Sequence, residues 1–432
     1  GGLNFSGSVE LHLPAGHQRS TVGGTNAAWL RCRVVEPQGR PAYRSSPRIA
    51  GLSAARAQER LPLIVSAEFP GGSVAVRDLD RQRRVLRISP AERLETGAAA
   101  WWYFRVEGIT PGETLTVEVG PHPIATPDRA FYRLESTEWT ATEPGERRGD
   151  FILYRVRVNA RTAWFACAPP FASPQTMEWI RRRSSHFSWF ELGKSGGRAI
   201  YAFHLRDPEV SEAHRAIVWV QARQQAWAAG SSWVCEGLRD WLLSEDVRAA
   251  ELRRRAEFYF VPVLDVDRVE RGASGLGISP HDLDHDWSER PALAPVRLAQ
   301  QRLERLIATG RLRVLLDLRQ TPTGRETLLV LPPNTLLTPA RLARVTAFAQ
   351  IARAEIQEPL PFRGGMRQPA AALHTPKESS ALAWVLQRTP DSMLALAVEA
   401  PWNAPGSDLA GYRRLGADLG RTLLAYLREP ER

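Results

Sequence analysis

Between residues 171 and 432, short apolar runs alternate with segments whose apolar residues recur at helical spacing. Buried strands are predicted at Ala216–Val220, Phe258–Val263, Val314–Leu318 and Met393–Val398. Helices are predicted between and after them: one capped by Ser231 or Ser232, one ending at Gly310, one opened by Thr338 and Pro339, and one over Asp408–Leu427. Such alternation builds a mostly parallel sheet with helices on both faces. The expected fold class is therefore α/β.

The segment before it, residues 61–170, has a different pattern. Its strand-like runs, among them Trp101–Val106, Leu115–Val119 and Phe151–Val158, alternate apolar and polar residues between turn residues. This pattern predicts an antiparallel β-sandwich of about 100 residues. We therefore expect three zones: a β-rich extension over 1–57, a sandwich over 61–170 and an α/β domain over 171–432, with residues 50–60 as a linker.

Composition and charge exclude several classes of protein. No apolar run reaches the roughly 18 residues that a membrane span needs, and residues 1–16 lack the pattern of a signal peptide. The three cysteines, Cys32, Cys167 and Cys235, are far apart and odd in number, which fits a reducing cytosol. The net charge of +10 comes from arginines spread along the chain, which disfavours a nucleic-acid patch. We expect a cytoplasmic protein with neither a membrane nor a nucleic-acid partner.

Polar residues gather where the predicted strands end. The four strands lead into residues 223–230, 265–269, 319–320 and 399–403, and a further polar loop spans residues 282–287. Because the carboxyl ends of parallel strands meet at one edge of a sheet, these segments are expected to form one site there.

In their order, spacing and placement at strand ends, these motifs resemble zinc carboxypeptidases of the cytosolic, tubulin-processing type and their bacterial relatives. The resemblance covers about residues 61–432. It rests on Phe69–Val74 and Trp101–Val106, which look like the small β-domain before the catalytic domain in that family, and on residues 231–238, 261–267 and 399–403. It implies a carboxypeptidase-like α/β domain over 171–432.

The family holds zinc through a His and a Glu three residues apart after the first strand, and a second His after the third strand. Here the three positions are Gln225, Ala228 and Arg319. A neutral amide is a poor zinc ligand, a methyl group has no donor atom, and a guanidinium is cationic. The resemblance therefore implies that the metal ligands are lost, and no zinc or other cofactor is expected.

The positions that bind substrate in the family are also altered. Asp284 and His285 align with the Asn-Arg pair that binds the terminal carboxylate of the substrate, and Asp284 would repel that group. Glu399 matches the catalytic general base; the alternative is a structural carboxylate paired with a nearby arginine. We expect Arg319 to form a buried ion pair with Glu399 and Asp284 in place of the metal; the alternative is that Arg319 points into solvent.

Residues 4–54 resemble part of a phage-type baseplate assembly protein. The resemblance rests on Leu13–His17, Ala28–Arg33, Tyr43 and Ser46–Ile49. It implies that the carboxypeptidase-like part is a module carried in a contractile-tail or related particle. The alternative is an ordinary β-extension that packs on the sandwich.

Two hypotheses of function follow. The first is a catalytically inactive zinc-carboxypeptidase-like protein of bacterial type. It would act as a binding or structural module for a peptide or protein partner, in a phage-tail-like assembly. The second is an active metallocarboxypeptidase that removes C-terminal residues from peptides, with Glu399 as the general base and a non-standard metal site. A basic nucleic-acid binder is a third, less supported reading. Metal analysis of the purified protein distinguishes the first two.

Overall fold

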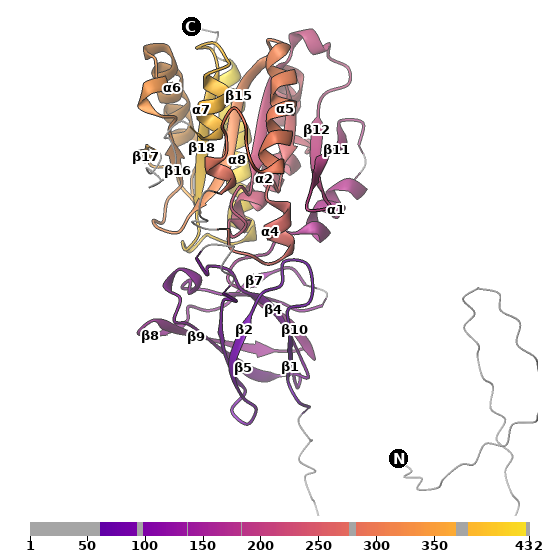
Figure 1. The fold of residues 1–432 in the computed structure, drawn as a ribbon, viewed down its shortest axis with the longest axis vertical. Coiled ribbons are helices and arrows are strands. Elements are labelled where there is room, and N and C mark those ends of the chain that lie inside the picture. The colour runs from indigo at the N-terminus through magenta and orange to yellow at the C-terminus, as the bar shows by residue number, and fades with distance from the viewer. Residues whose placement is uncertain are drawn as a thin grey trace, which may run out of the picture. The chain divides into compact units, whose positions relative to one another are not determined.

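The computed structural model describes residues 61–92, 98–135, 137–182, 184–275, 282–368 and 379–428 (Figure 1). The chain divides after Ala57 into two units, and the unit Gln58–Arg432 contains every element described below. The β-rich extension expected over residues 1–57 and the linker expected over 50–60 lie outside the described residues. Among the described helices, none is long and apolar enough to cross a bilayer.

Residues 64–166 form two five-stranded sheets, in the orders β1-β4-β10-β6-β7 and β2-β3-β5-β9-β8. The strands are β1 (Ile64–Ser66), β2 (Ala75–Asp80), β3 (Val85–Ser89), β4 (Tyr103–Glu107), β5 (Glu113–Val119), β6 (Phe131–Arg133), β7 (Thr140–Ala141), β8 (Glu146–Arg148), β9 (Phe151–Val158) and β10 (Thr162–Ala166). Leu115, Val117 and Val119 alternate into the buried core, as the period of two predicts. The pairing is antiparallel except between β3 and β5, which run parallel because the intervening β4 belongs to the other sheet.

Residues 187–401 form one eight-stranded sheet in the order β11-β12-β14-β13-β15-β18-β16-β17. Its strands are β11 (Phe187–Ser195), β12 (Arg198–Leu205), β13 (Ala216–Ala222), β14 (Ala256–Val261), β15 (Leu312–Thr321), β16 (Leu328–Val330), β17 (Met366–Arg367) and β18 (Leu394–Pro401). The central four strands, β14, β13, β15 and β18, are parallel, while β12 and β16 pair with them in the antiparallel sense. This is the mostly parallel α/β sheet that the sequence predicts.

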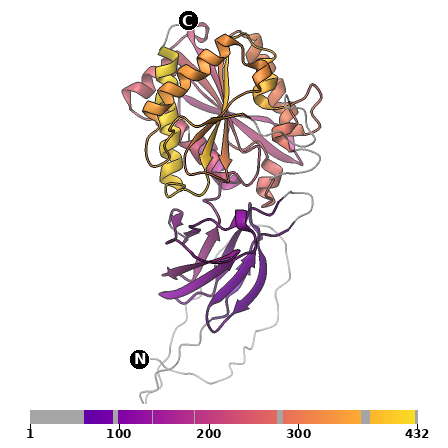
Figure 2. The ribbon, with the colours of Figure 1, turned by 90° about the vertical axis from the view of Figure 1, so that its left-hand side faces the viewer.

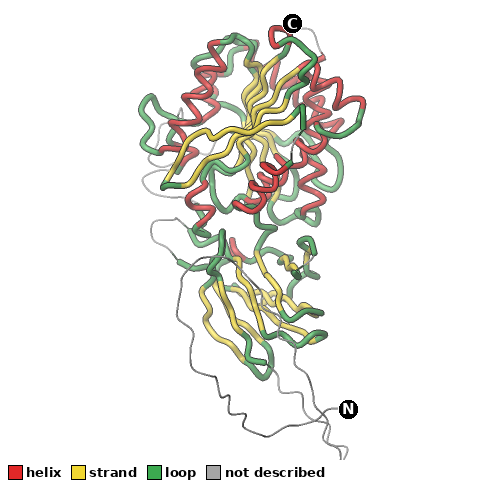
Figure 3. Tube along the Cα trace, turned by 90° about the vertical axis from the view of Figure 1, so that its right-hand side faces the viewer, coloured by secondary structure: helices red, strands yellow, loops and turns green. Residues whose placement is uncertain are grey.

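Helices cover both faces of this sheet (Figures 2 and 3). They are α1 (Ser173–Arg181), α2 (Ala229–Leu242), α3 (Val247–Arg255), α4 (Val266–Glu270), α5 (Ala294–Ala308), α6 (Pro339–Glu355), α7 (Ala381–Leu386) and α8 (Leu409–Arg428). Successive residues of β13 point to opposite faces: Val218 and Val220 join a core with α2, α6 and α8, and Ile217 and Trp219 join a core with α5 and α7. Both faces of the central strands are therefore buried, which explains their continuous apolar runs.

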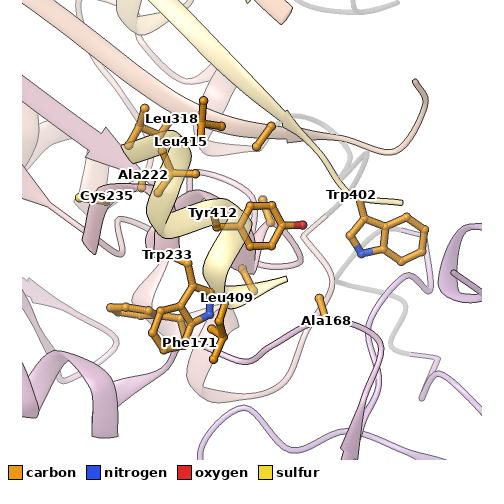
Figure 4. Packing of buried hydrophobic residues seen from close by; sticks show 14 of the residues in the cluster. Ala168, Phe171, Ala222, Trp233, Cys235, Leu318, Trp402, Leu409, Tyr412 and Leu415 are labelled. Carbon is orange, nitrogen blue, oxygen red and sulfur yellow. The ribbon is translucent and has the colours of Figure 1, made fainter. Parts of the chain in front are cut away.

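Helices α2 and α8 cross at very short distance. A Cβ atom on Gly416 of α8 would lie 2.1 Å from the carbonyl oxygen of Val234, and one on Gly237 of α2 would lie 2.1 Å from that of Arg413. Glycine is therefore required at both positions. Figure 4 shows part of the surrounding core, with Leu409, Tyr412 and Leu415 of α8 among Phe171, Trp233 and Trp402.

The helix starts test the predicted caps. The Thr338 hydroxyl accepts from the Arg341 N–H at the start of α6, so that predicted cap is confirmed. The cap predicted at Ser231 or Ser232 is wrong, because α2 begins earlier, at Ala229. The two hydroxyls donate instead to the carbonyl oxygens of Ala228 and Pro262. A short hydroxyl side chain can satisfy a backbone carbonyl as readily as it caps a helix.

Candidate functional site

The carboxyl ends of β13, β15 and β18 lie side by side at one edge of the eight-stranded sheet. The register of β15 and β18 places Arg319 opposite Glu399. Gln225 and Ala228 lie in the turn between β13 and α2. Parallel pairing thus brings positions that are far apart in the sequence to one edge, where sites of open α/β sheets form.

Arg319 lies between two carboxylates. Its Nη1 donates to Asp284 Oδ2 at 2.8 Å, its Nη2 donates to Asp284 Oδ1, and its Nε donates to Asp317 Oδ2 at 2.7 Å. The Arg319 side chain is 18% exposed, that of Asp284 10% and that of Asp317 0%. The ion pair with Asp284 is the expected one, and Arg319 does not point into solvent. The second partner is Asp317 rather than Glu399, because Asp317 lies two residues before Arg319 on the same side of β15.

Asp317 is also held by two glutamines. Its Oδ2 accepts from Gln224 Nε2 at 2.8 Å, and its Oδ1 accepts from Gln221 Nε2 at 3.4 Å. Gln224 Oε1 in turn accepts from the indole N–H of Trp287 at 2.7 Å. These bonds join β13, β15 and the loop over residues 282–287, so the buried carboxylate is fully satisfied by side chains.

Gln225 uses both ends of its amide. Its Nε2 donates to Asp282 Oδ2 at 3.3 Å, and its Oε1 accepts from the indole N–H of Trp227 at 3.0 Å. Asp282 Oδ1 is hydrogen-bonded to His285 Nδ1 at 2.8 Å. The amide oxygen, which is the atom of Gln225 that could face a metal, is therefore already engaged.

Ala228 is the N-cap residue of α2 and is buried. Its N–H donates to the carbonyl oxygen of Gln225 at 3.1 Å, so the two positions adjoin across one tight turn. Its methyl side chain contributes no donor or acceptor to this turn.

Glu399 is paired with an arginine from β17. Arg367 Nε donates to Oε2 at 3.1 Å and Nη2 donates to Oε1 at 2.5 Å. The Glu399 side chain is 5% exposed, and that of Arg367 is 40% exposed. The expected contact of Glu399 with Arg319 is thus replaced, because Arg319 is turned toward Asp284 and Asp317. This pairing is what the alternative hypothesis expects, namely that Glu399 is a structural carboxylate paired with a nearby arginine.

Burial and charge act against one another in this cluster. Burial lowers the pKa of Arg319, but the charges of Asp284, Asp317 and Glu399 raise it more, so the net shift is upward. Burial raises the pKa of Asp284 and of Asp317 more than the Arg319 charge lowers it. The hydrogen bond to Asp282 raises the pKa of His285. Arg319 is therefore held as a cation, and its charge opposes the effect of burial on the pKa of the two aspartates.

This set of side chains does not fit a zinc ion. Catalytic zinc is held by three nitrogen, sulfur or carboxylate donors and keeps a position for water. The three candidate positions offer an engaged amide, a methyl group and an ion-paired guanidinium. Over the described residues, no group of three or more His, Cys, Asp or Glu is placed to hold a metal. No reaction step through zinc follows from this arrangement.

Three further residues of the cluster were not singled out from the sequence as site residues: Asp317, Asp282 and Arg367. The spacing of Asp317 and Arg319 in a strand puts them on one side and was a usable signal. The hydrogen bond between Asp282 and His285 spans three residues in a short 3₁₀ turn, which the sequence did not predict. Arg367 lies in a two-residue strand 32 residues before Glu399, and nothing in the local pattern indicates this contact.

Comparisons with known proteins match part of this chain to zinc carboxypeptidases. Residues 175–291 match the family described as zinc carboxypeptidase; the match includes Gln225, Ala228 and Asp284 and ends before Arg319 and Glu399. An uncharacterised protein of Zymomonas mobilis is 26% identical over 245 residues, which is 54% of this chain and 61% of that protein. Human cytosolic carboxypeptidase 1 is 34% identical over 101 residues, 23% of this chain and 8% of that enzyme. The chain thus spans less than two thirds of the length of these relatives.

Solved structures extend the likeness over most of the chain. A metallo-carboxypeptidase from Burkholderia cenocepacia superimposes with a TM-score of 0.72 at 17% identity, covering 84% of this chain and 98% of that one. A metallo-carboxypeptidase from Pseudomonas aeruginosa gives a TM-score of 0.69 at 21% identity, covering 84% of this chain and 100% of that one. The chain therefore shares the fold of these two metallo-carboxypeptidases, and its residues 175–291 match the sequence model of the zinc carboxypeptidase family.

Proposed function

We propose that this chain is a catalytically inactive zinc-carboxypeptidase-like protein that acts as a binding or structural module. The observation that supports this most directly is the position of Arg319. Its guanidinium stands where the resembled family has a histidine ligand, and it is bound to Asp284 and Asp317. A fixed cation at that point repels a metal dication and already neutralises the nearby carboxylates.

The state of Glu399 supports the same proposal. A general base needs a carboxylate oxygen within reach of the water that it deprotonates. Both oxygens of Glu399 accept hydrogen bonds from Arg367, so the carboxylate is already occupied by a guanidinium. Without zinc to acidify a water molecule, the remaining carboxylate has no activated nucleophile to act on.

The residue at position 284 also supports a ligand that differs from the peptide C-terminus bound by the resembled family. Asp284 stands at a position that binds the terminal carboxylate of the substrate in the resembled family. Its carboxylate forms an ion pair with Arg319. We propose a peptide or protein as the partner of the module, in the cytoplasm. The finer proposal of a phage-tail-like particle rests on residues 4–54 and on the sequence resemblance alone.

Metal analysis combined with a peptidase assay tests the proposal. The purified protein is incubated with zinc, passed through a desalting column and analysed for bound metal, and peptides with free C-termini are then offered as substrates. We expect less than stoichiometric zinc and no release of C-terminal residues. An active zinc carboxypeptidase treated in parallel shows that the procedure retains a bound metal.

The competing function, an active metallocarboxypeptidase that uses Glu399 as the general base, predicts the opposite result. One equivalent of metal, release of C-terminal residues and loss of that activity in Glu399→Gln would together establish it. That outcome would end the proposal of an inactive module.

A further inference from the structure

A cavity lies between the sandwich and the α/β domain, and its lining does not include Arg319, Asp284 or Glu399. It has a volume of about 380 Å³. It is lined by Asp128, Arg129, Phe131, Ala141, Pro144, Gly145 and Arg147 of the sandwich and by Arg325, residues 402–405, Ser407 and Asp408 of the α/β domain. An adjoining cavity of about 460 Å³ shares Arg325, Pro405 and Asp408 with it. This size, and a place between two domains, are typical of sites for small ligands.

The walls of this cavity are held together by hydrogen bonds. Asn403 Oδ1 accepts from the backbone N–H of Asp128 at 2.8 Å, which joins the sandwich to the loop after β18. Ser407 Oγ accepts from the Ala404 N–H at 2.9 Å and donates to the Pro401 carbonyl oxygen at 2.7 Å. The cavity is therefore formed before a ligand arrives, which lowers the entropy cost of binding.

The lining of the cavity carries more arginines than aspartates. Asp128 accepts from Arg147 at 2.8 Å and lies 3.9 Å from Arg325, whose side chain is 73% exposed. Arg129 donates from Nη1 to the carbonyl oxygen of Thr142 at 3.2 Å, and it has no carboxylate partner within the described residues. Asp408 accepts from the Gly411 N–H in the first turn of α8. Three arginines thus face two aspartates, one of which is engaged by the helix.

The rest of the lining is largely apolar. Phe131 and Trp402 contribute aromatic surface, and Ala141, Pro144, Ala404 and Pro405 complete the wall. Asn403 uses its carbonyl oxygen for the Asp128 N–H, and its Nδ2 has no hydrogen-bond acceptor among the described residues, so it can donate to a ligand.

We propose that this cavity binds a small organic anion: a carboxylate on an apolar ring or chain. The carboxylate pairs with Arg129 and Arg325, where a guanidinium can bind it in two-pronged geometry. The apolar body packs against Trp402 and Phe131. Arg319, Asp284 and Glu399 do not line this cavity, so the proposal does not depend on whether the site around Arg319 is catalytically active.

Ligand-detected NMR with the full chain tests the proposal. The probe is benzoate, and benzamide serves as a neutral probe of the same shape. Arg129→Gln should weaken benzoate binding by about tenfold, which is about 1.4 kcal/mol, because the variant loses a charge-assisted hydrogen bond to the carboxylate. Arg325→Gln should weaken it as well, and this exposed substitution leaves the fold intact. Benzamide should bind more weakly than benzoate to the unmodified protein.

Arg157→Gln is the matched control. Arg157 is exposed on β9, donates to one backbone carbonyl oxygen, that of Gly112, and does not line the cavity. Benzoate affinity unchanged in this variant and reduced in the other two would support the site. The proposal is overturned if benzoate shows no saturable binding, binds to Arg129→Gln and Arg325→Gln as tightly as to the unmodified protein, or binds no better than benzamide.

Discussion

Replacing Arg319 by leucine should destabilise the fold strongly. The substitution removes the cation that binds Asp284 and Asp317, and it leaves two aspartates in place, with side chains 10% and 0% exposed. Breaking a buried ion pair from one side costs roughly 3–5 kcal/mol, because the remaining charge is uncompensated. The hydrogen bonds that Gln221 and Gln224 donate to Asp317 remain in the variant, so the loss of stability should stay within that range.

The loss of stability in Arg319→Leu should depend on pH, and the pKa shifts of Asp284 and Asp317 determine the direction of this dependence. Burial already raises the pKa of Asp284 and Asp317 above their unfolded values, and the loss of Arg319 raises it further. A carboxyl group with a raised folded pKa binds its proton more tightly in the folded state, so stability falls as pH rises through the window between the two values. Arg319→Leu should therefore be closer to the unmodified protein at acidic pH than at neutral pH.

Urea unfolding followed by circular dichroism at several pH values measures this effect. Arg305→Leu, on the exposed face of α5, is the control and should change stability by less than about 0.5 kcal/mol. In Arg319→Ala, added millimolar guanidinium should recover part of the loss, whereas sodium chloride at the same concentration should not. An unfolding midpoint unchanged by Arg319→Leu at neutral pH would refute the reasoning, because the two carboxylates would then not need the guanidinium.

Three further predictions follow from other contacts. In urea unfolding, Arg367→Gln should lower the free energy of unfolding more than Glu399→Gln does. The first variant leaves the Glu399 carboxylate, which is 5% exposed, without its partner. The second leaves the Arg367 side chain, which is 40% exposed, and should cost about 1 kcal/mol or less. Gly416→Ala should destabilise by roughly 1–3 kcal/mol in the same assay, because its Cβ would lie 2.1 Å from the Val234 carbonyl oxygen. The hydrogen bond to Asp282 raises the pKa of His285, so protonated His285 stabilises the fold below about pH 6.5, and this contribution is lost as pH rises through the folded pKa. His285→Gln should flatten the stability profile over that window; an unchanged profile would contradict the assignment.

Much of the α/β domain could be predicted because its signals are local. The apolar runs that became β13, β14, β15 and β18 are buried on both faces, and such strands cannot be mistaken for exposed ones. The cap at Thr338 depends on one side chain and its own helix. The cap predicted at Ser231 or Ser232 was wrong because α2 begins at Ala229, so both serines lie inside the helix and donate to the carbonyl oxygens of Ala228 and Pro262.

The sequence by itself determined that a methyl group, an amide and a guanidinium stand at three positions near the ends of two strands, because residue identity needs no coordinates. It also determined the strand–helix order that places those ends at one edge of a sheet. Only the tertiary structure decided which carboxylate each arginine binds. Arg319 faces Asp284 and Asp317, while Glu399 faces Arg367, since ion pairs form between side chains that packing brings within a few ångströms, whatever their separation along the chain.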